Sequence, residues 1–152
     1  MDPIEGMALR YLARRDRTEA QVRALLRQKG VSVSDRDLVI QRLRDQGYVD
    51  DLAYALRQVE GWLCRRPMGR ARIERELLRR GIDRSTAHQA VDQLVGDQGE
   101  LELACRLLDR RSGRRKQASL AEKARLLRYY GFAEDTIEKI TGKDVAAVEW
   151  LD

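Results

Sequence analysis

Cysteine, histidine, proline and aromatic residues are all scarce in this chain of 152 residues. Two cysteines, Cys64 and Cys105, and one histidine, His88, are too few for a four-ligand zinc site, so we expect neither a metal nor a cofactor. We expect both thiols to be reduced and buried as packing residues. Because only 5% of the residues are aromatic and only two are proline, the sequence favours uninterrupted helices with cores of leucine and alanine.

Long apolar runs and catalytic groupings are also missing. No apolar segment approaches the length of a membrane span, and none follows Met1 as a secretion signal would. His88 has no serine or cysteine partner in a catalytic pattern, and we expect it at an exposed helix position. The acids Asp50 and Asp51 are explained more simply as the start of a helix than as a carboxylate pair. The sequence therefore predicts a soluble, cytoplasmic protein that is not an enzyme and has no membrane partner.

Three glycines recur at a nearly constant interval. Gly30, Gly81 and Gly131 lie 51 and 50 residues apart, and an apolar residue follows each of them. Alanine stands ten residues before each glycine and leucine four residues before. A period of about 50 residues is typical of small supersecondary units stacked side by side, which usually present an extended surface to a partner. The first expectation is a binding protein.

Each repeat has the pattern of three short helices. The middle helix runs from a cap residue to the repeated glycine, and the cap residues are Thr18, Gly69 and Ser119. An amphipathic helix precedes it, with apolar positions that include Leu52, Leu56 and Val59 in the second repeat and Leu101, Cys105 and Leu108 in the third. Another helix follows, and its apolar face in the first repeat is Val39, Ile40 and Leu43. The expected caps of the third helices are Ser34 or Asp35, then Asp83, then a residue within 133–135. No alternating pattern is long enough for a strand.

The predicted fold class is therefore all-α, an elongated array of three tandem three-helix repeats. We place the repeats at residues 7–49, 50–96 and 97–152. The third is the most divergent, since Lys123 replaces an apolar residue that the first two repeats share. We expect this third repeat to be the most loosely packed or to act as an end cap.

Basic charge recurs with the repeat. Of the 30 basic residues 25 are arginine, whose planar fork suits phosphate and carboxylate groups. Basic residues outnumber acidic ones by seven to two in segment 10–29, eight to three in 65–84 and nine to two in 106–128. A basic surface repeated along an elongated body fits a nucleic-acid backbone or an acidic groove on a protein polymer. The alternative is three ordinary solvated helix faces.

We do not expect sequence-specific DNA recognition, because the basic helices carry few side chains that could form hydrogen bonds with the edges of the bases. Phosphate contact without base readout stays open. The aromatic residues that could stack on unpaired bases are Tyr54, Trp62, Tyr129 and Tyr130. Trp62 shares the spacing of the core-facing stripe, whereas Tyr54 lies off that stripe. We therefore expect Tyr54 to be exposed.

The most distinctive motifs lie in the second repeat. YVDDLAYA at 48–55 opens its first helix, and MGRARIERELLRRGI at 68–82 forms its second. The first repeat adds ALRYLARR at 8–15 and LLRQKG at 25–30. With these motifs the chain resembles the RecX family, bacterial regulators of the RecA recombinase, from about residue 7 to the end. It departs at Cys64–Met68, where Lys-Gly is commoner in the family ahead of the helix, and in the sparse third repeat.

The resemblance implies three three-helix repeats that bind the RecA filament on single-stranded DNA, along its helical groove. It further implies inhibition of ATP hydrolysis, strand exchange and repressor co-cleavage. The expected partners are the RecA filament and the phosphates of single-stranded DNA, with double-stranded DNA left open. We expect a monomer, because no long heptad run indicates a coiled coil. The alternatives are a general basic nucleic-acid-binding protein that competes for DNA, and a scaffold or chaperone-like protein with another partner.

We place the centre of the contact surface in the second repeat, where dense positive charge lies beside the best-matching motifs. The residues assigned to electrostatic contact are Arg65, Arg66, Arg70, Arg72, Arg75 and Arg79. Tyr54 is assigned as an anchor for the partner.

Overall fold

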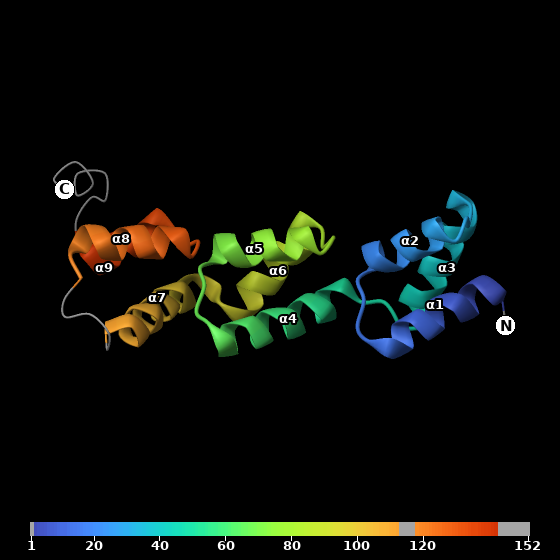
Figure 1. The fold of residues 1–152 in the computed structure, drawn as a ribbon, viewed down its shortest axis with the longest axis horizontal. Helices are drawn as coiled ribbons and strands as arrows, with labels where there is room; N and C mark the ends of the chain where they lie inside the picture. Colours follow the sequence, from blue (N-terminus) through green and yellow to red (C-terminus); the bar gives the residue numbers. More distant parts are fainter. Residues whose placement is uncertain (1, 113–117, 143–152) are drawn as a thin grey trace.

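The computed structural model describes residues 2–112 and 118–142, and within these ranges all regular structure is α-helical. The helices are α1 (Pro3–Arg14), α2 (Glu19–Gln28), α3 (Val33–Asp45), α4 (Asp51–Arg65), α5 (Arg70–Arg79), α6 (Arg84–Leu94), α7 (Gly96–Ser112), α8 (Leu120–Tyr129) and α9 (Glu134–Thr141). They follow one another along an elongated body (Figure 1). The prediction of an all-helical fold is confirmed.

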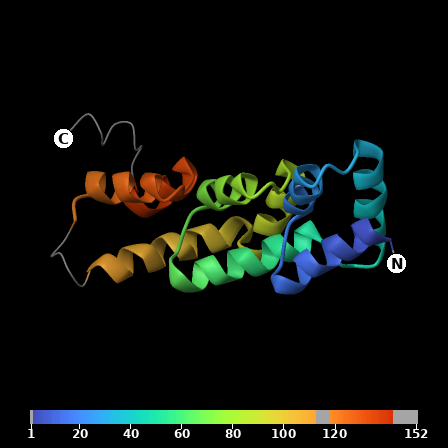
Figure 2. The ribbon, with the colours of Figure 1, turned by 45° about the vertical axis from the view of Figure 1, so that its right-hand side comes forward.

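Equivalent helices line up along the molecule. We call α1–α3, α4–α6 and α7–α9 the first, second and third units. The first helix of each unit lies along one long side, and the middle helices α2, α5 and α8 lie end to end along the other (Figures 1 and 2). In the second and third units the third helix fills the space between, because α6 packs against both α4 and α5 and α9 packs against both α7 and α8.

Helix starts follow local capping chemistry. The side chains of Thr18, Asp83 and Ser119 each accept a backbone hydrogen bond at the start of α2, α6 and α8, as predicted. Gly69 caps α5 without a side-chain bond. The predicted cap of α3 is wrong: Ser32 takes that position, and its hydroxyl accepts from the Asp35 amide. Ser32 stands two residues after Gly30, as Asp83 does after Gly81, so the repeat itself specifies this cap.

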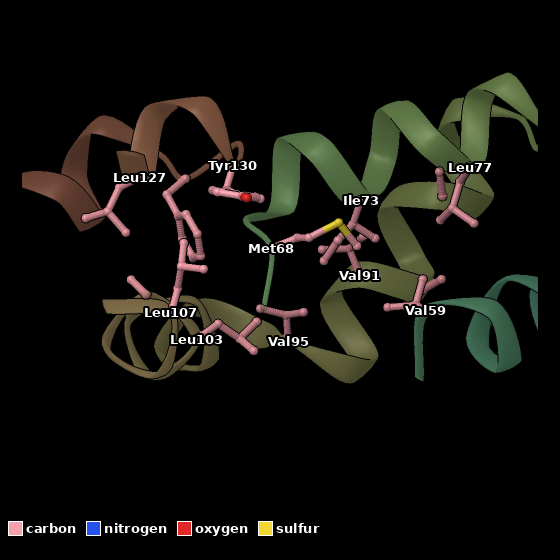
Figure 3. Close-up of a cluster of buried hydrophobic side chains, with 14 of the residues drawn as sticks. Val59, Met68, Ile73, Leu77, Val91, Val95, Leu103, Leu107, Leu127 and Tyr130 are labelled. Carbon is pink, nitrogen blue, oxygen red and sulfur yellow. The ribbon is translucent and has the colours of Figure 1, made fainter. Parts of the chain in front are cut away.

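Two separate hydrophobic cores hold the chain together. One lies within the first unit and includes Val22, Leu26 and Ile40. The other runs without a break through the second and third units. Figure 3 shows the side chains of this second core passing from one unit into the other, from Ile73 and Met68 across to Tyr130 and Leu127. The described part of the third unit therefore shares its core with the second unit, and the first unit has a core of its own. That the third repeat is the most loosely packed or acts as an end cap stays a prediction.

Both cysteines are exposed, so the prediction that they are packing residues is wrong. On α7 the predicted apolar stripe included Cys105, whereas the buried positions are Leu103, Ala104 and Leu107. The true stripe is therefore displaced along the helix, and Cys105 falls outside it. Cys64 lies in the last turn of α4, where Trp62 and Leu63 pack against the core while Cys64 itself is exposed.

Candidate functional site

The middle helices α2, α5 and α8 form one continuous line, which we call the basic row (Figure 1). The N-terminus of α5 meets the C-terminus of α8, and the N-terminus of α2 meets the C-terminus of α5. Each contact places free amide or hydroxyl groups against the unpaired carbonyls that end a helix. The row is thus built from the same cap and glycine turn in every unit.

The joint between α5 and α8 is made by main chain on both sides. The Gly69 amide donates to the Tyr130 carbonyl at 2.8 Å, and the Ala71 amide donates to the Gly131 carbonyl at 3.2 Å. A Cβ on Gly69 would lie 2.3 Å from the Gly131 carbonyl group, and a Cβ on Gly131 would lie 2.5 Å from the Arg72 Cβ. Only glycine allows the two chains to approach so closely.

The joint between α2 and α5 relies on side chains. The Thr18 hydroxyl donates to the Arg80 carbonyl at 3.1 Å, and the Glu19 amide donates to the Asp51 carboxylate at 2.9 Å. A Cβ on Gly81 would lie 2.5 Å from the Ala20 Cβ. Burial raises the pKa of the Asp51 carboxyl, which the bond from the Glu19 amide partly offsets.

The outer side of the basic row carries guanidinium groups. Its exposed arginines are Arg27 on α2, Arg75 and Arg79 on α5, and Arg125 on α8. Arg75 and Arg125 occupy equivalent positions, six residues before Gly81 and Gly131. Neither has an ion pair within the described part of the chain. Such unpaired cations attract anions more strongly than ones already neutralised by a neighbour.

Other cations on the row are paired with acids. Arg23 contacts Asp37 at 2.6 Å and Glu19 at 3.2 Å, and the hydrogen bond that it donates to Asp37 raises the pKa of its guanidinium. The Arg128 Nε donates to Glu134 at 2.7 Å, which lowers the pKa of that carboxyl. These pairs fix side chains on the flanks of the row and reduce its net charge there.

The six predicted arginines divide into two groups. Arg65, Arg66, Arg75 and Arg79 are exposed. Arg70 and Arg72 are half-buried, the first in an ion pair with Asp92 and the second lying over two tyrosine rings. Four of the six, Arg70, Arg72, Arg75 and Arg79, lie on α5, whereas Arg65 ends α4 and Arg66 is the C-cap of α4. The four exposed ones are accessible to a partner. Their role in binding stays a prediction.

The prediction for Tyr54 is wrong. Its side chain is only 6% exposed and belongs to the core shared by the second and third units. The stripe of Leu52, Leu56 and Val59 underestimated the buried face of α4, because α6 packs along that helix and covers Tyr54 and Ala55 as well. Tyr54 stabilises the second unit and cannot anchor a partner.

The exposed aromatic residue of this surface is Tyr129, at 71% exposure, while its neighbour Tyr130 is buried. The Arg72 guanidinium lies 5.4 Å from the Tyr129 ring centre and 4.9 Å from that of Tyr130. Trp62 is half-buried, with Arg80 over its ring at 4.6 Å. The sequence offered Tyr129 only as one of four candidates. Its register identifies it, since it stands two residues before the repeated glycine, where Arg79 and Gln28 are exposed.

His88 is exposed on α6, as expected, and its ring nitrogens lie 3.2 Å from Glu74 and 3.2 Å from Asp92. Among the described residues no group of three or more histidine, cysteine or acidic side chains could hold a metal ion. No helix in the described ranges has the length and apolarity needed to cross a membrane. The chemistry of this surface is therefore that of cations and an aromatic ring.

Two family models match the chain. The model for the first three-helix domain of RecX matches residues 6–43, and that for the second three-helix domain matches residues 50–91. Regulatory protein RecX of Trichlorobacter lovleyi is 34% identical over 128 residues, which cover 84% of this chain and 82% of that protein. Regulatory protein RecX of Thermobifida fusca is 34% identical over 95 residues, covering 62% of this chain and 51% of that protein.

Solved structures agree. The crystal structure of RecX from Lactobacillus salivarius superposes with a TM-score of 0.81 at 25% identity, over 93% of this chain and 94% of that one. A second crystal structure of a regulatory protein RecX gives 0.75 at 25% identity, over 92% of this chain and 70% of that one. Because these matches span nearly the whole chain, the likeness includes the third unit as well as the two with a family model.

Proposed function

This chain belongs to the RecX family of regulatory proteins, and on that premise we propose that it modulates, mainly by inhibition, the RecA recombinase. It binds the RecA filament on single-stranded DNA along the helical groove. By doing so it suppresses ATP hydrolysis, strand exchange and the co-protease activity. The third unit acts as a third repeat in this binding, extending the surface formed by the first two.

The observation that carries the proposal is the basic row. Helices α2, α5 and α8 lie along one side of an elongated molecule (Figure 2), and each of them carries at least one exposed arginine. A filament offers the same acidic or phosphate groups again and again along its length. Several weak contacts made at once raise the total affinity well above that of any one contact. A pocket-based activity would not need such a line of charge.

The experiment is DNA-dependent ATP hydrolysis by RecA, with the protein added to preformed filaments at fixed salt. Inhibition at a small fraction of the RecA concentration is the expected result. Inhibition only at amounts that coat the DNA, with a steep loss as salt rises, would instead indicate the general nucleic-acid-binding protein. Absence of inhibition at any amount would overturn both.

Charge reversal locates the surface. Arg75→Glu with Arg79→Glu changes two exposed positions of the basic row and is expected to weaken inhibition. Arg70 and Arg72 are poorer choices, because their side chains also hold the fold. The matched control is Arg10→Glu with Arg106→Glu, which makes the same charge change on α1 and α7, on the other long side. Equal loss from both pairs would show a general charge effect and remove the assignment of the basic row.

A further inference from the structure

Among the described residues Tyr129 is the most exposed of the large hydrophobic side chains. It lies in the last turn of α8, where that helix meets α5. The Tyr130 ring stands edge-on to it, with ring centres 5.1 Å apart and an interplanar angle of 86°. Burial of its neighbour fixes the place of Tyr129, while its own ring stays open to solvent. An exposed ring held in one position is suited to stacking.

Two arginines lie beside the Tyr129–Tyr130 pair. Arg72 lies beside both tyrosines, and the Arg66 guanidinium is 5.6 Å from the Tyr130 ring centre. We call Arg66, Arg72, Tyr129 and Tyr130 the stacking cluster. The nearby acid Glu134 is already bound by Arg128. The cluster therefore presents positive charge next to an uncovered aromatic face.

The main chain holds the cluster in advance of any partner. Backbone bonds join Gly69 to Tyr130 and Ala71 to Gly131, so α5 and α8 cannot shift relative to each other without breaking them. The Arg72 side chain begins against Gly131, where no Cβ would fit. A partner binding here would lose little conformational freedom of the protein, which favours affinity.

We propose that Tyr129 stacks on an unpaired base of single-stranded DNA, while Arg66 and Arg72 contact the adjacent phosphates. Every base offers a π-face and every nucleotide a phosphate, so this combination of ring and guanidinium groups binds single strands without regard to sequence. An acidic peptide would satisfy the guanidinium groups but would leave the Tyr129 ring without a matching surface. The proposal rests on the DNA contact of the proposed function and not on contact with RecA.

The test measures binding of the isolated protein to a fluorescein-labelled oligothymidylate by fluorescence anisotropy at fixed salt. Tyr129→Ala is expected to weaken binding about tenfold, the usual loss when one stacking ring is removed. Tyr129→Phe keeps the ring and is expected to bind as the unchanged protein does. The matched control is Tyr48→Ala, which removes a tyrosine that is 56% exposed in the connection between α3 and α4 and should have no effect.

Two further probes separate stacking from charge. On an abasic oligonucleotide of the same length, and on a blunt duplex, Tyr129→Ala and the unchanged protein are expected to bind equally, because neither offers an unpaired base. Equal binding to oligothymidylate would overturn the proposal, and so would a similar loss on the abasic strand. A loss of binding to polyglutamate caused by Tyr129→Ala would also overturn it and would indicate a protein partner. Thermal unfolding checks that each variant is folded.

The result is independent of the RecA experiment. Stacking on oligothymidylate without any inhibition of RecA would leave the stacking cluster standing and remove the proposed function. If the protein inhibits RecA but Tyr129 plays no part in binding oligothymidylate, the proposed function stands and the stacking proposal is overturned.

Discussion

The position of Gly131 requires glycine for two separate reasons. Its φ of +84° lies in the left-handed region, and a Cβ there would approach Arg72 to 2.5 Å. Gly96 has a φ of +64° but no atom within 4 Å of the position of its Cβ. Both glycines belong to the part of the molecule built on the shared core. Alanine substitutions at these two positions therefore separate the free-energy cost of a left-handed backbone from the free-energy cost of a steric clash.

We predict that Gly131→Ala lowers the free energy of unfolding by about 3 kcal/mol, and Gly96→Ala by about 1 kcal/mol. The first change adds overpacking between α5 and α8 to the strain of the left-handed backbone. Urea unfolding followed by circular dichroism measures both. Equal losses would contradict the close contact at this joint.

A second prediction for a single residue concerns the contribution of Asp83 to stability at low pH. The Thr86 amide donates to the Asp83 carboxylate at 2.7 Å, and this bond lowers the pKa of Asp83 below its ordinary value of 3.8. A lowered pKa means that the ionised group stabilises the folded state above the pKa of the unfolded chain. This stabilisation disappears as the pH falls through the folded pKa.

We therefore predict that Asp83→Asn, which keeps the capping oxygen, is slightly less stable than the unchanged protein at pH 7 and equally stable near pH 2. Urea unfolding at a series of pH values gives the difference. A difference that stays constant down to pH 2 would show that the charge of Asp83 adds nothing to the cap.

Residue exposure was the hardest feature to predict from the sequence. Periodicity placed Val39, Ile40 and Leu43 in the core, and they are buried. It failed for Tyr54, because α6 packs along α4 and the buried face of that helix is wider than the stripe. Spacing within α8 alone did not single out Tyr129, whereas comparison of the repeats does, because Arg79 and Gln28 at the equivalent positions are exposed as well.

At the scale of the helix, cap positions were predictable wherever a side chain bonds within its own turn, as at Thr18 and Ser119. Helix α9 is different, because the side chain of its N-cap residue, Ala133, cannot form a capping hydrogen bond. The Ala133 amide instead donates at 2.7 Å to the carboxylate of Glu100, which lies on α7 and is 4% exposed. A cap supplied by another helix leaves no local pattern in the sequence.

We predict that Glu100→Ala lowers the free energy of unfolding by about 2 kcal/mol, because it removes the charged acceptor of a partly buried hydrogen bond. The matched control is Glu102→Ala, two residues away on the exposed side of the same helix, which should change little. Hydrogen exchange provides a second measurement, and we expect faster exchange in α9 for the first variant. Unchanged exchange there would mean that the bond to Glu100 does not hold α9.

At the scale of the whole molecule, the joint between the first and second units differs from the joint between the second and third units, although the helices repeat in the same order. Main-chain bonds and a shared core fasten the second unit to the third. Polar side chains join the first unit to the second, through Thr18, through Asp51, and through an Arg57–Asp16 pair at 2.8 Å. Exposed ion pairs contribute little. The basic row therefore has one firm joint and one that a small change can loosen.

Asp51 is the residue through which to test this difference. Because burial raises its pKa, the ionised carboxylate costs folding free energy at neutral pH, and this cost disappears as the pH falls through the folded pKa. Asparagine would keep the oxygen that accepts from the Glu19 amide without that cost. We predict that Asp51→Asn preserves the joint, whereas Asp51→Ala loosens the first unit while leaving both cores folded.

Spin labels at Gln46→Cys and Gln89→Cys, in a chain with Cys64→Ser and Cys105→Ser, report the distance between the first and second units by double electron–electron resonance. Both label sites are exposed and lie outside the joint. The distance distribution should broaden in Asp51→Ala and stay narrow in Asp51→Asn. Equal widths would show that the Asp51 bond does not restrain the first unit. Broadening would mean that the three basic helices form a line whose first third can adjust its angle to the curvature of a filament.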